Sequence, residues 1–136
     1  TADAAFSLKE ADLAIVADIG SLQRLPYLIG EGRLRELAFT TRQFGAAEAQ
    51  TMGLVNQVFP DAAQLWDGVG AIAAGIAAKS PLTVRGVKQV LNYSRDHSVA
   101  DGLDYVATWN AAMLLSDDTR EAVAATLAKR HPRFED

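Results

Sequence analysis

Two carboxylic acids near the start of the chain, Glu10 and Asp18, could carry out proton-transfer chemistry. They flank a mostly apolar run, Leu13 to Ala17, and Gly20 follows soon after Asp18. A charged side chain beside an apolar wall either faces water at the mouth of a pocket or belongs to a site that needs it. Two carboxyl groups in different environments can divide the roles of general base and general acid. We therefore take Glu10 and Asp18 as the candidate catalytic residues.

The separation of the two acids along the chain requires a turn between them. In a straight helix, the eight residues from Glu10 to Asp18 would span about 12 Å at ~1.5 Å per residue. That distance is too long for two groups acting on one substrate, so the sequence predicts a turn that brings them together. Taken alone, each acid also has a simpler interpretation, Asp18 as a helix cap and Glu10 as a solvated charge. Asp12, between them, is interpreted as a surface residue.

The bulk composition excludes several classes of function. The 136 residues are 49% hydrophobic and 22% charged, which is typical of a folded globular domain. A net charge of −4 gives no electrostatic reason to expect nucleic acid or an anionic membrane as a partner. The sequence has no cysteine, and its two histidines, His97 and His131, cannot form a histidine metal cage alone. No apolar run has the length of a membrane span, and no signal segment opens the chain.

Short elements are predicted over residues 1–60. Ala4 to Leu8 is apolar and typical of a sheet edge, and a helical pattern runs from Ile19 to Ile29. Pro26 should interrupt that helix unless it starts a new segment. The remaining predictions are helices over 33–40 and 46–52, Gly53 at a C-terminal cap, and a strand over 54–59 that Pro60 ends.

Long helices are predicted over residues 61–136. The first is Ala-rich and covers 61–79, with glycines that indicate close packing against a neighbour. Ser80-Pro81 starts a second helix that ends near Ser94, and Ser98 with Asp101 starts a third that ends near Leu115. Asp118-x-x-Glu121 is expected to cap a last helix through Lys129, followed by a loose or pinned tail. The predicted fold class is mainly α with short β stubs.

Four segments together resemble the enoyl-CoA hydratase/isomerase (crotonase) superfamily. They are Phe6-Ser-Leu-Lys-Glu10, Gly20-Ser-Leu-Gln-Arg-Leu-Pro26, Leu37-Ala-Phe-Thr-Thr-Arg42 with Ala46-x-Glu-Ala-x-x-x-Gly-Leu-Val55 after it, and Lys79-Ser-Pro81. The resemblance implies the C-terminal half of a crotonase-like α/β (ββα spiral) fold. The resemblance implies that residues 1–60 are the part of the core that carries the acid pair. It implies that residues 61–136 form a helical region that covers the acyl pocket and mediates oligomerisation, as a trimer or hexamer. The first residue is Thr1, which suggests a piece of a longer chain whose upstream half would hold the oxyanion hole.

Within the superfamily, the spacing of Glu10 and Asp18 looks like that of the Δ3,5-Δ2,4-dienoyl-CoA isomerases. Asn92-Tyr-Ser-Arg-Asp-His-Ser-Val99 and Tyr105-Val-Ala-x-Trp-Asn110 add to this likeness. The resemblance implies an isomerase that shifts the double bonds of 3,5-dienoyl-CoA to 2,4-dienoyl-CoA in fatty acid β-oxidation. Asp18 would be the base at C2 and Glu10 the acid at C6. It implies no separate cofactor, because coenzyme A is part of the acyl-CoA substrate.

Other interpretations stay open at this point. An enoyl-CoA hydratase or a Δ3,Δ2-enoyl-CoA isomerase is the alternative within the same class, and a non-catalytic assembly module is the alternative from another class. The CoA-contacting residues are unknown; Lys79, Arg85 and Lys88 are candidates, although charges on a helix face are usually solvated. Further expectations are that Tyr105 and Trp109 belong to the core or line the acyl pocket and that His97 is a loop and cap residue. The composition and the lack of a targeting signal favour a bacterial cytoplasm.

Overall fold

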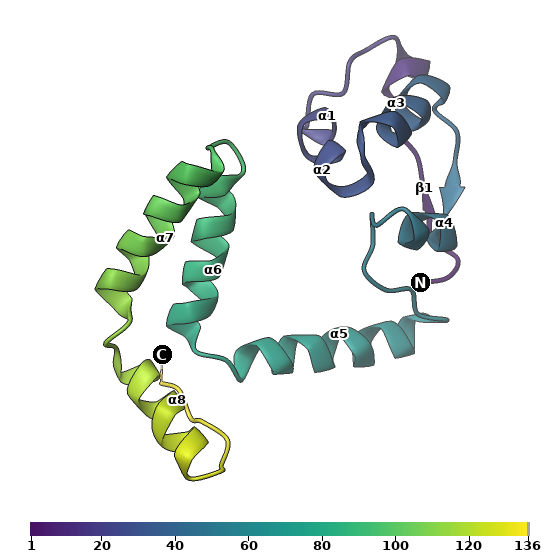
Figure 1. The fold of residues 1–136 in the computed structure, drawn as a ribbon. Coiled ribbons are helices and arrows are strands. Elements are labelled where there is room, and N and C mark those ends of the chain that lie inside the picture. The colour runs from purple at the N-terminus through teal and green to yellow at the C-terminus, as the bar shows by residue number, and fades with distance from the viewer. Residues whose placement is uncertain (136) are drawn as a thin grey trace. The chain divides into compact units, whose positions relative to one another are not determined.

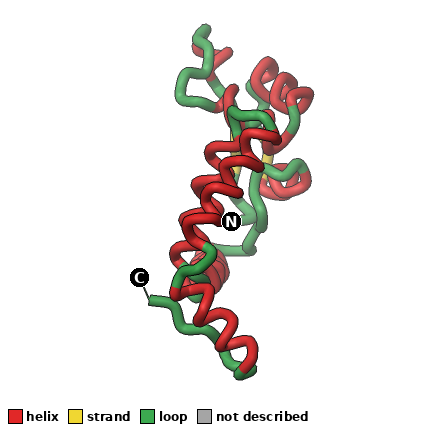
Figure 2. Tube along the Cα trace, turned by 60° about the vertical axis from the view of Figure 1, so that its left-hand side comes forward, coloured by secondary structure: helices red, strands yellow, loops and turns green. Residues whose placement is uncertain are grey.

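The computed structural model describes residues 1–135 and divides into two compact units, Thr1–Val69 and the residues from Gly70 onward. Both units are built mainly from helices, and the only strands in the described part of the chain are two short ones (Figure 2). The predicted fold class, mainly α with short strands, is confirmed. The functional division at residue 60 stays a prediction. No helix of the described residues is long and apolar enough to cross a membrane.

The first unit is a succession of short elements (Figure 1). In chain order they are β1 (Ala5–Phe6), the 3-10 helix η1 (Glu10–Leu13), α1 (Ser21–Arg24), α2 (Pro26–Ile29), α3 (Glu31–Thr40), β2 (Phe44–Gly45) and α4 (Ala46–Thr51). β1 and β2 pair antiparallel, and Phe6 lies opposite Phe44. The predicted sheet edge is therefore confirmed in a shorter form.

Pro26 divides the predicted helix over 19–29 into α1 and α2. It occupies the first position of α2, where a helix has no partner for the N–H group that proline lacks. Gly30 then ends α2 with a φ of 80°, which is a left-handed value that glycine adopts without a steric penalty. The interruption that the sequence predicted at Pro26 is confirmed.

The strand predicted over 54–59 is wrong. These residues adopt bends and irregular structure, and β1 pairs instead with β2, which the sequence did not predict. The apolar residues at the start of this segment have another role, because Leu54 and Val55 pack against the core of the unit. The Leu54 N–H donates to the Ala49 carbonyl at 2.9 Å, so the chain folds back on α4 here and does not extend.

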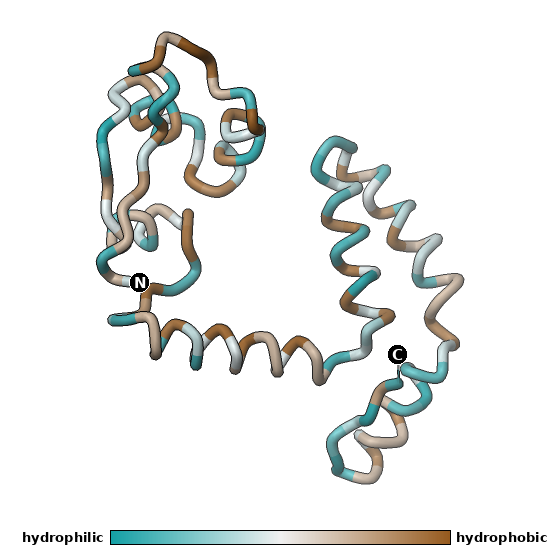
Figure 3. Tube along the Cα trace, turned by 180° about the vertical axis from the view of Figure 1, so that it is seen from behind, coloured by the Kyte–Doolittle hydropathy of each residue, from teal (hydrophilic) through white to brown (hydrophobic). Residues whose placement is uncertain are grey.

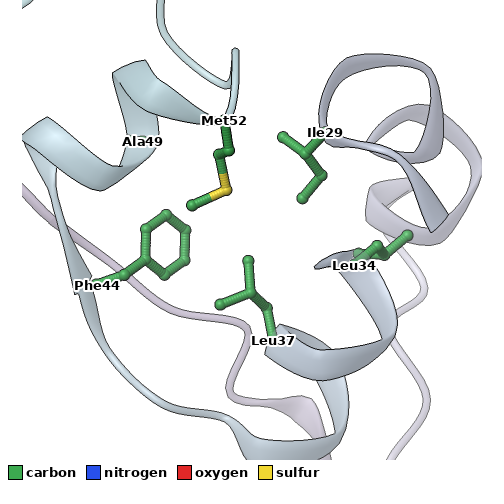
Figure 4. Close-up of a cluster of buried hydrophobic side chains, with 6 residues drawn as sticks. All are labelled: Ile29, Leu34, Leu37, Phe44, Ala49 and Met52. Carbon is green, nitrogen blue, oxygen red and sulfur yellow. The ribbon is translucent and has the colours of Figure 1, made fainter. Parts of the chain in front are cut away.

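A small hydrophobic core holds the first unit together (Figure 4). Its buried members come from α2, α3, β2, α4 and the residue after α4, and the side chains of Ile29, Leu37, Phe44 and Met52 point toward one centre. They are Ile29, Leu34, Leu37, Phe44, Ala49 and Met52. Leu37, in the middle of α3, is the most enclosed large side chain, with 1% of its surface exposed. Gly53, with a φ of 84°, follows Met52 and confirms the predicted C-terminal cap.

The remaining helices are α5 (Ala62–Ala77), α6 (Pro81–Ser94), α7 (Val99–Met113) and α8 (Asp117–Leu127). The two predicted caps are confirmed: Ser80 accepts from the Thr83 N–H at 3.0 Å, and Ser98 forms a reciprocal capping box with Asp101. α6 and α7 lie side by side (Figure 1).

Two glycines permit close packing of a helix against a neighbouring aromatic ring. A Cβ at Gly86 of α6 would lie 2.5 Å from the Trp109 Nε1 atom of α7, and one at Gly68 of α5 would lie 2.1 Å from the Phe59 ring. The close packing predicted for the glycines of α5 is therefore confirmed at Gly68. Gly70 and Gly75 have no such neighbour within 4 Å among the described residues.

The predicted cap of the last helix is wrong in detail. Ser116, not Asp118, is the N-cap of α8, and its side chain accepts from the Thr119 N–H at 3.3 Å. Asp118 instead accepts a hydrogen bond from Ser80, 38 positions earlier in the chain. The tail is pinned: Glu121 pairs with Arg130 and accepts from the Arg133 N–H at 2.7 Å. The contact with Arg130, and to a smaller extent that with Arg133, lowers the pKa of Glu121 to about 2.

Replacing Leu37 by alanine should destabilise the first unit strongly, because the enclosed side chain would leave a cavity. We expect a loss of about 2–5 kcal/mol in the free energy of unfolding, measured by urea denaturation followed by circular dichroism. The matched control is Leu28→Ala, since Leu28 is 54% exposed and should cost about 0.5 kcal/mol or less. Equal losses in the two variants would contradict the assigned core.

Candidate active site

Glu10 lies at the start of η1 and lines an apolar hollow of about 180 Å³ in the first unit. The other lining residues come from the segment around η1, from α1 and from the end of α3. They are Leu8, Ala11, Ile15, Val16, Ala17, Leu22, Ala38 and Phe39. Glu10 is thus the one ionisable side chain among the residues that form this hollow. The Glu10 side chain is half-buried and has no hydrogen-bond partner among residues 1–135.

The chain turns immediately after η1. Ala14 has a φ of 57° and a ψ of 32°, in the left-handed region, and the Ile15 N–H donates to the Glu10 carbonyl at 3.1 Å. A turn between the two acids is therefore present, and that it brings their carboxyl groups together stays a prediction. It directs residues 15–17 back along the hollow that Glu10 lines.

Asp18 follows this turn but does not line the hollow that contains Glu10. Its side chain is exposed, and it lies between the buried Ala17 and Gly20, the residue that precedes α1. The interpretation of Asp18 as a helix cap is not supported, because Gly20 is the N-cap and no side chain caps α1. The two acids thus share one short segment, and only Glu10 lies in the hollow.

Apolar side chains surround the acids on the surface. Leu13 is 67% exposed, Val16 75% and Ile19 78%. Figure 3 shows hydrophobic colour along the loop that leads from η1 to α1. Exposed apolar patches of this kind typically mark a surface that binds a ligand or another protein segment. The acids therefore stand at the edge of a surface suited to an apolar group.

A polar cluster of Lys9, Asp12 and Thr41 fastens η1 to the end of α3. The Thr41 hydroxyl is 2.7 Å from the Asp12 Oδ1 atom, and the Lys9 Nζ atom is 3.2 Å from both the Asp12 Oδ2 atom and the Thr41 carbonyl oxygen. The Ser7 hydroxyl donates to the same carbonyl at 2.8 Å. The sequence interpretation placed Asp12 on the surface, and it is indeed exposed, but it missed this cluster. The Thr41 hydroxyl, and then Lys9, hold the pKa of Asp12 below its ordinary value.

Arg42, the residue after Thr41, ties α3 to α4. Its guanidinium donates to Glu36 at 2.6 and 3.0 Å and to Glu48 at 2.6 and 3.1 Å. Planar guanidinium groups suit such paired contacts with carboxylates. Arg42 lowers the pKa of Glu36 and of Glu48, and the two carboxylates raise the pKa of Arg42, Glu48 first. The Glu48 of the motif that suggested the family therefore has a structural partner here.

The candidate CoA contacts lie in the second unit. Arg85 and Lys88 are exposed on α6, whereas Lys79 lines a hollow of about 780 Å³ with Ser80, Asp118 and His131. None of the described residues forms a cluster of acids and histidines that could hold a metal ion.

The aromatic residues of the second unit have structural partners. Trp109 is half-buried against Gly86, and Tyr105 stacks on Tyr93 with ring centroids 4.2 Å apart. His97 also stacks on Tyr93, with ring centroids 3.8 Å apart, and its Nδ1 atom is 2.7 Å from the Tyr93 carbonyl oxygen. That carbonyl, followed by Asp96, raises the pKa of His97. These contacts agree with His97 as a loop residue next to the cap of α7.

Comparison with known proteins identifies the family. The sequence model described as "Enoyl-CoA hydratase/isomerase" matches residues 1–136, and the chain belongs to this family. A peroxisomal Δ(3,5)-Δ(2,4)-dienoyl-CoA isomerase of Arabidopsis thaliana is 58% identical over 132 residues, covering 97% of this chain and 48% of the relative. The mitochondrial enzyme of that name from Rattus norvegicus is 49% identical, covering 96% of this chain and 40% of the relative.

Solved structures agree with the family. The enoyl-CoA hydratase of Bacillus anthracis superposes with a TM-score of 0.93 at 34% identity, covering 98% of this chain and 51% of that one. The predicted crotonase-like fold is thereby confirmed. The chain spans about half the length of the relatives that it matches.

The hydrogen bonds in the Lys9–Asp12–Thr41 cluster predict how Asp12 titrates. Its carboxyl carbon, followed by NMR as the pH falls, should titrate below the ordinary pKa of aspartate. Thr41→Val should raise this pKa more than Lys9→Met does, because the hydroxyl is the larger cause. Since the pKa is lowered on folding, the stability that the cluster contributes is present above the unfolded pKa and is lost as pH falls through the folded one. An unchanged midpoint in Thr41→Val would contradict this assignment.

Proposed function

We propose that this chain is the C-terminal half of a Δ3,5-Δ2,4-dienoyl-CoA isomerase of fatty acid β-oxidation. One observation carries the proposal: in a chain 58% identical to an isomerase of that name, a carboxylate, Glu10, is the sole ionisable group in an apolar hollow. A carboxyl group beside an apolar surface is suited to handle a proton on an otherwise unreactive acyl chain. The substrate is an acyl-CoA, and no separate cofactor takes part.

The reaction moves one proton off the substrate and another onto it. The Asp18 carboxylate takes a proton from C2, and the electron pair of that C–H bond forms an extended enolate on the thioester. Glu10, in its protonated form, then delivers a proton at C6, and the double bonds come to lie at C2 and C4. Each carboxyl ends in the opposite protonation state, so exchange with solvent resets the pair before the next turnover.

The enolate oxygen requires hydrogen-bond donors that are fixed before the reaction begins. We propose that these donors, and most of the CoA pocket, lie in a segment N-terminal to Thr1. The proposal is supported by the relatives, which are about twice as long as this chain. The oxyanion hole would therefore come from a part of the protein outside these 136 residues.

A hydratase or a Δ3,Δ2-enoyl-CoA isomerase is the alternative within the family. It is less well supported, because the enoyl-CoA hydratase structure from Bacillus anthracis is 34% identical to the chain while the dienoyl-CoA isomerase relatives reach 58%. The cellular site is a proposal too. These relatives are named as peroxisomal and mitochondrial proteins, so the cytoplasm inferred from composition stays a prediction.

A role in assembly is the alternative from another class, and it rests on α5. Large apolar side chains recur along this helix with their surfaces exposed: Val69 at 42%, Ile72 at 52% and Ile76 at 52%. Their spacing places them close to one face of a helix. Such a face is suited to a contact between copies of the protein, in a trimer or hexamer, and this role is compatible with catalysis elsewhere in the chain.

Isotope exchange in the complete protein separates the roles of the two acids. In deuterated water, Asp18→Asn should lose both isomerisation and deuterium uptake at C2, because the first proton cannot leave. Glu10→Gln should lose isomerisation by about 100-fold or more but keep uptake at C2, since the enolate returns its proton from solvent. Uptake is read by mass spectrometry of the recovered dienoyl-CoA. Isomerisation at the wild-type rate in Asp18→Asn would show that Asp18 is not the base.

Assay of the 136-residue chain alone tests the proposed need for an upstream segment. We expect it to associate, as measured by analytical ultracentrifugation, and to convert no dienoyl-CoA, as followed by the absorbance of the conjugated product. The complete protein is the matched control and should turn the substrate over. Turnover by the chain alone would refute the upstream oxyanion hole, and an inactive complete protein would favour the assembly role.

A further inference from the structure

Thr41 has a backbone conformation that its residue type disfavours. Its φ is 53° and its ψ is 13°, in the left-handed region, and only 7% of its surface is exposed. Branching at Cβ makes this region costly for threonine, whereas glycine adopts it freely. A residue held in such a conformation indicates that its surroundings over-determine it, and these positions gather at functional sites. Thr41 is the C-cap of α3, a position where left-handed residues are common and glycine is the usual choice, so the contacts of its side chain are of interest here.

The side chain of Thr41 fastens the segment that carries Glu10. Its hydroxyl is 2.7 Å from both the Asp12 Oδ1 atom and the Thr40 carbonyl oxygen. A hydroxyl has one proton, and a charged carboxylate is the stronger acceptor of the two. Ser7 and Lys9 bind the Thr41 carbonyl from the same segment. Three residues around Glu10 thus contact one residue at the end of α3.

The geometry connects this contact to the hollow. Glu10 and Asp12 lie in the same short helix, η1, so a shift of Asp12 moves the backbone that carries Glu10. The wall of the hollow also includes Ala38 and Phe39 of α3, which lie three and two positions before Thr41, the residue that follows this helix. The Glu10 side chain has no hydrogen-bond partner of its own among the described residues. Its position relative to that wall is therefore set through the backbone of η1.

We propose that Asp12 and Thr41 are positioning residues for Glu10. Their hydrogen bond holds η1 against the end of α3, so that the Glu10 carboxyl faces the apolar hollow at a fixed distance from Phe39. This inference rests on the proposed function, in which Glu10 delivers the proton at C6. It assigns the strained backbone of Thr41 to catalysis and not to stability alone.

Three substitutions at Thr41 in the complete protein separate positioning from stability. Thr41→Val keeps the shape and removes the hydroxyl, Thr41→Ser restores the hydroxyl, and Thr41→Gly relieves the backbone while leaving no hydroxyl. We expect Thr41→Val to lower kcat about 10- to 100-fold, as a small misplacement of a catalytic group does, with KM changed by about twofold at most. Thr41→Ser should recover kcat to within about threefold of the wild type. Thr41→Gly should raise the Tm above that of Thr41→Val and stay slow.

Deuterium uptake at C2 supplies a readout that general damage would change. Asp18 lies outside the cluster, so uptake should continue at the wild-type rate in Thr41→Val while isomerisation falls. The inference is overturned if uptake and isomerisation fall together, if Thr41→Val keeps the wild-type kcat, or if Thr41→Gly recovers it. The wild type decides the proposed function separately: a wild type that isomerises no dienoyl-CoA refutes that function and this inference with it.

Discussion

The burial of Leu37 is the interaction on which the first unit depends. α3 presents Leu34 and Leu37 to the core, and this packing fixes the axis of the helix against α2, β2 and α4. The same helix supplies Ala38 and Phe39 to the wall of the hollow, and Thr41 follows its last residue. A helix anchored by its apolar face can therefore hold a polar contact at its end in a defined place. The core and the candidate site are two consequences of one packed helix.

Two residues that follow α3, Thr41 and Arg42, make most of the polar contacts at this end of the helix. Thr41 holds η1 through its carbonyl and hydroxyl, and Arg42 holds α4 through two carboxylates. Exposed ion pairs contribute little to stability one at a time, but several on one group restrict its geometry. Local strain at Thr41 is tolerated because these contacts surround it.

Local signals in the sequence predicted the local features of the fold. The caps at Ser80 and Ser98, the break at Pro26 and the cap at Gly53 each depend on residues within a turn of one another. Interactions between distant residues were missed. β2 pairs with a strand about 40 positions earlier, Asp118 accepts from Ser80, and Asp12 meets Thr41 across 29 positions. The periodicity of a sequence does not predict such long-range contacts, because they form only when the chain has folded.

In the candidate site too, local features were predicted from the sequence and long-range contacts were missed. Glu10 and Asp18 were found from their residue types and from a resemblance, and the turn between them from the length of a helix. Asp12 was taken for a surface charge, since an exposed aspartate next to lysine has no local sign of a partner at position 41. A single left-handed residue at Thr41 is visible only in the backbone. The candidate catalytic residues could thus be proposed from the sequence, whereas the contact between Asp12 and Thr41 is visible only in the fold.

The exposure of the apolar loop after η1 has a consequence for the proposed mechanism. Leu13, Val16 and Ile19 face solvent, so water reaches the surroundings of Glu10 when no substrate is present. An acyl chain laid across them would remove that water, and desolvation of a carboxyl group favours its neutral form. Binding would then place the acyl chain beside Glu10, which lines the hollow, and not beside Asp18, which lies outside it. The two acids of the proposed mechanism would thus differ in their surroundings, because only Glu10 lies in the hollow that the substrate would cover.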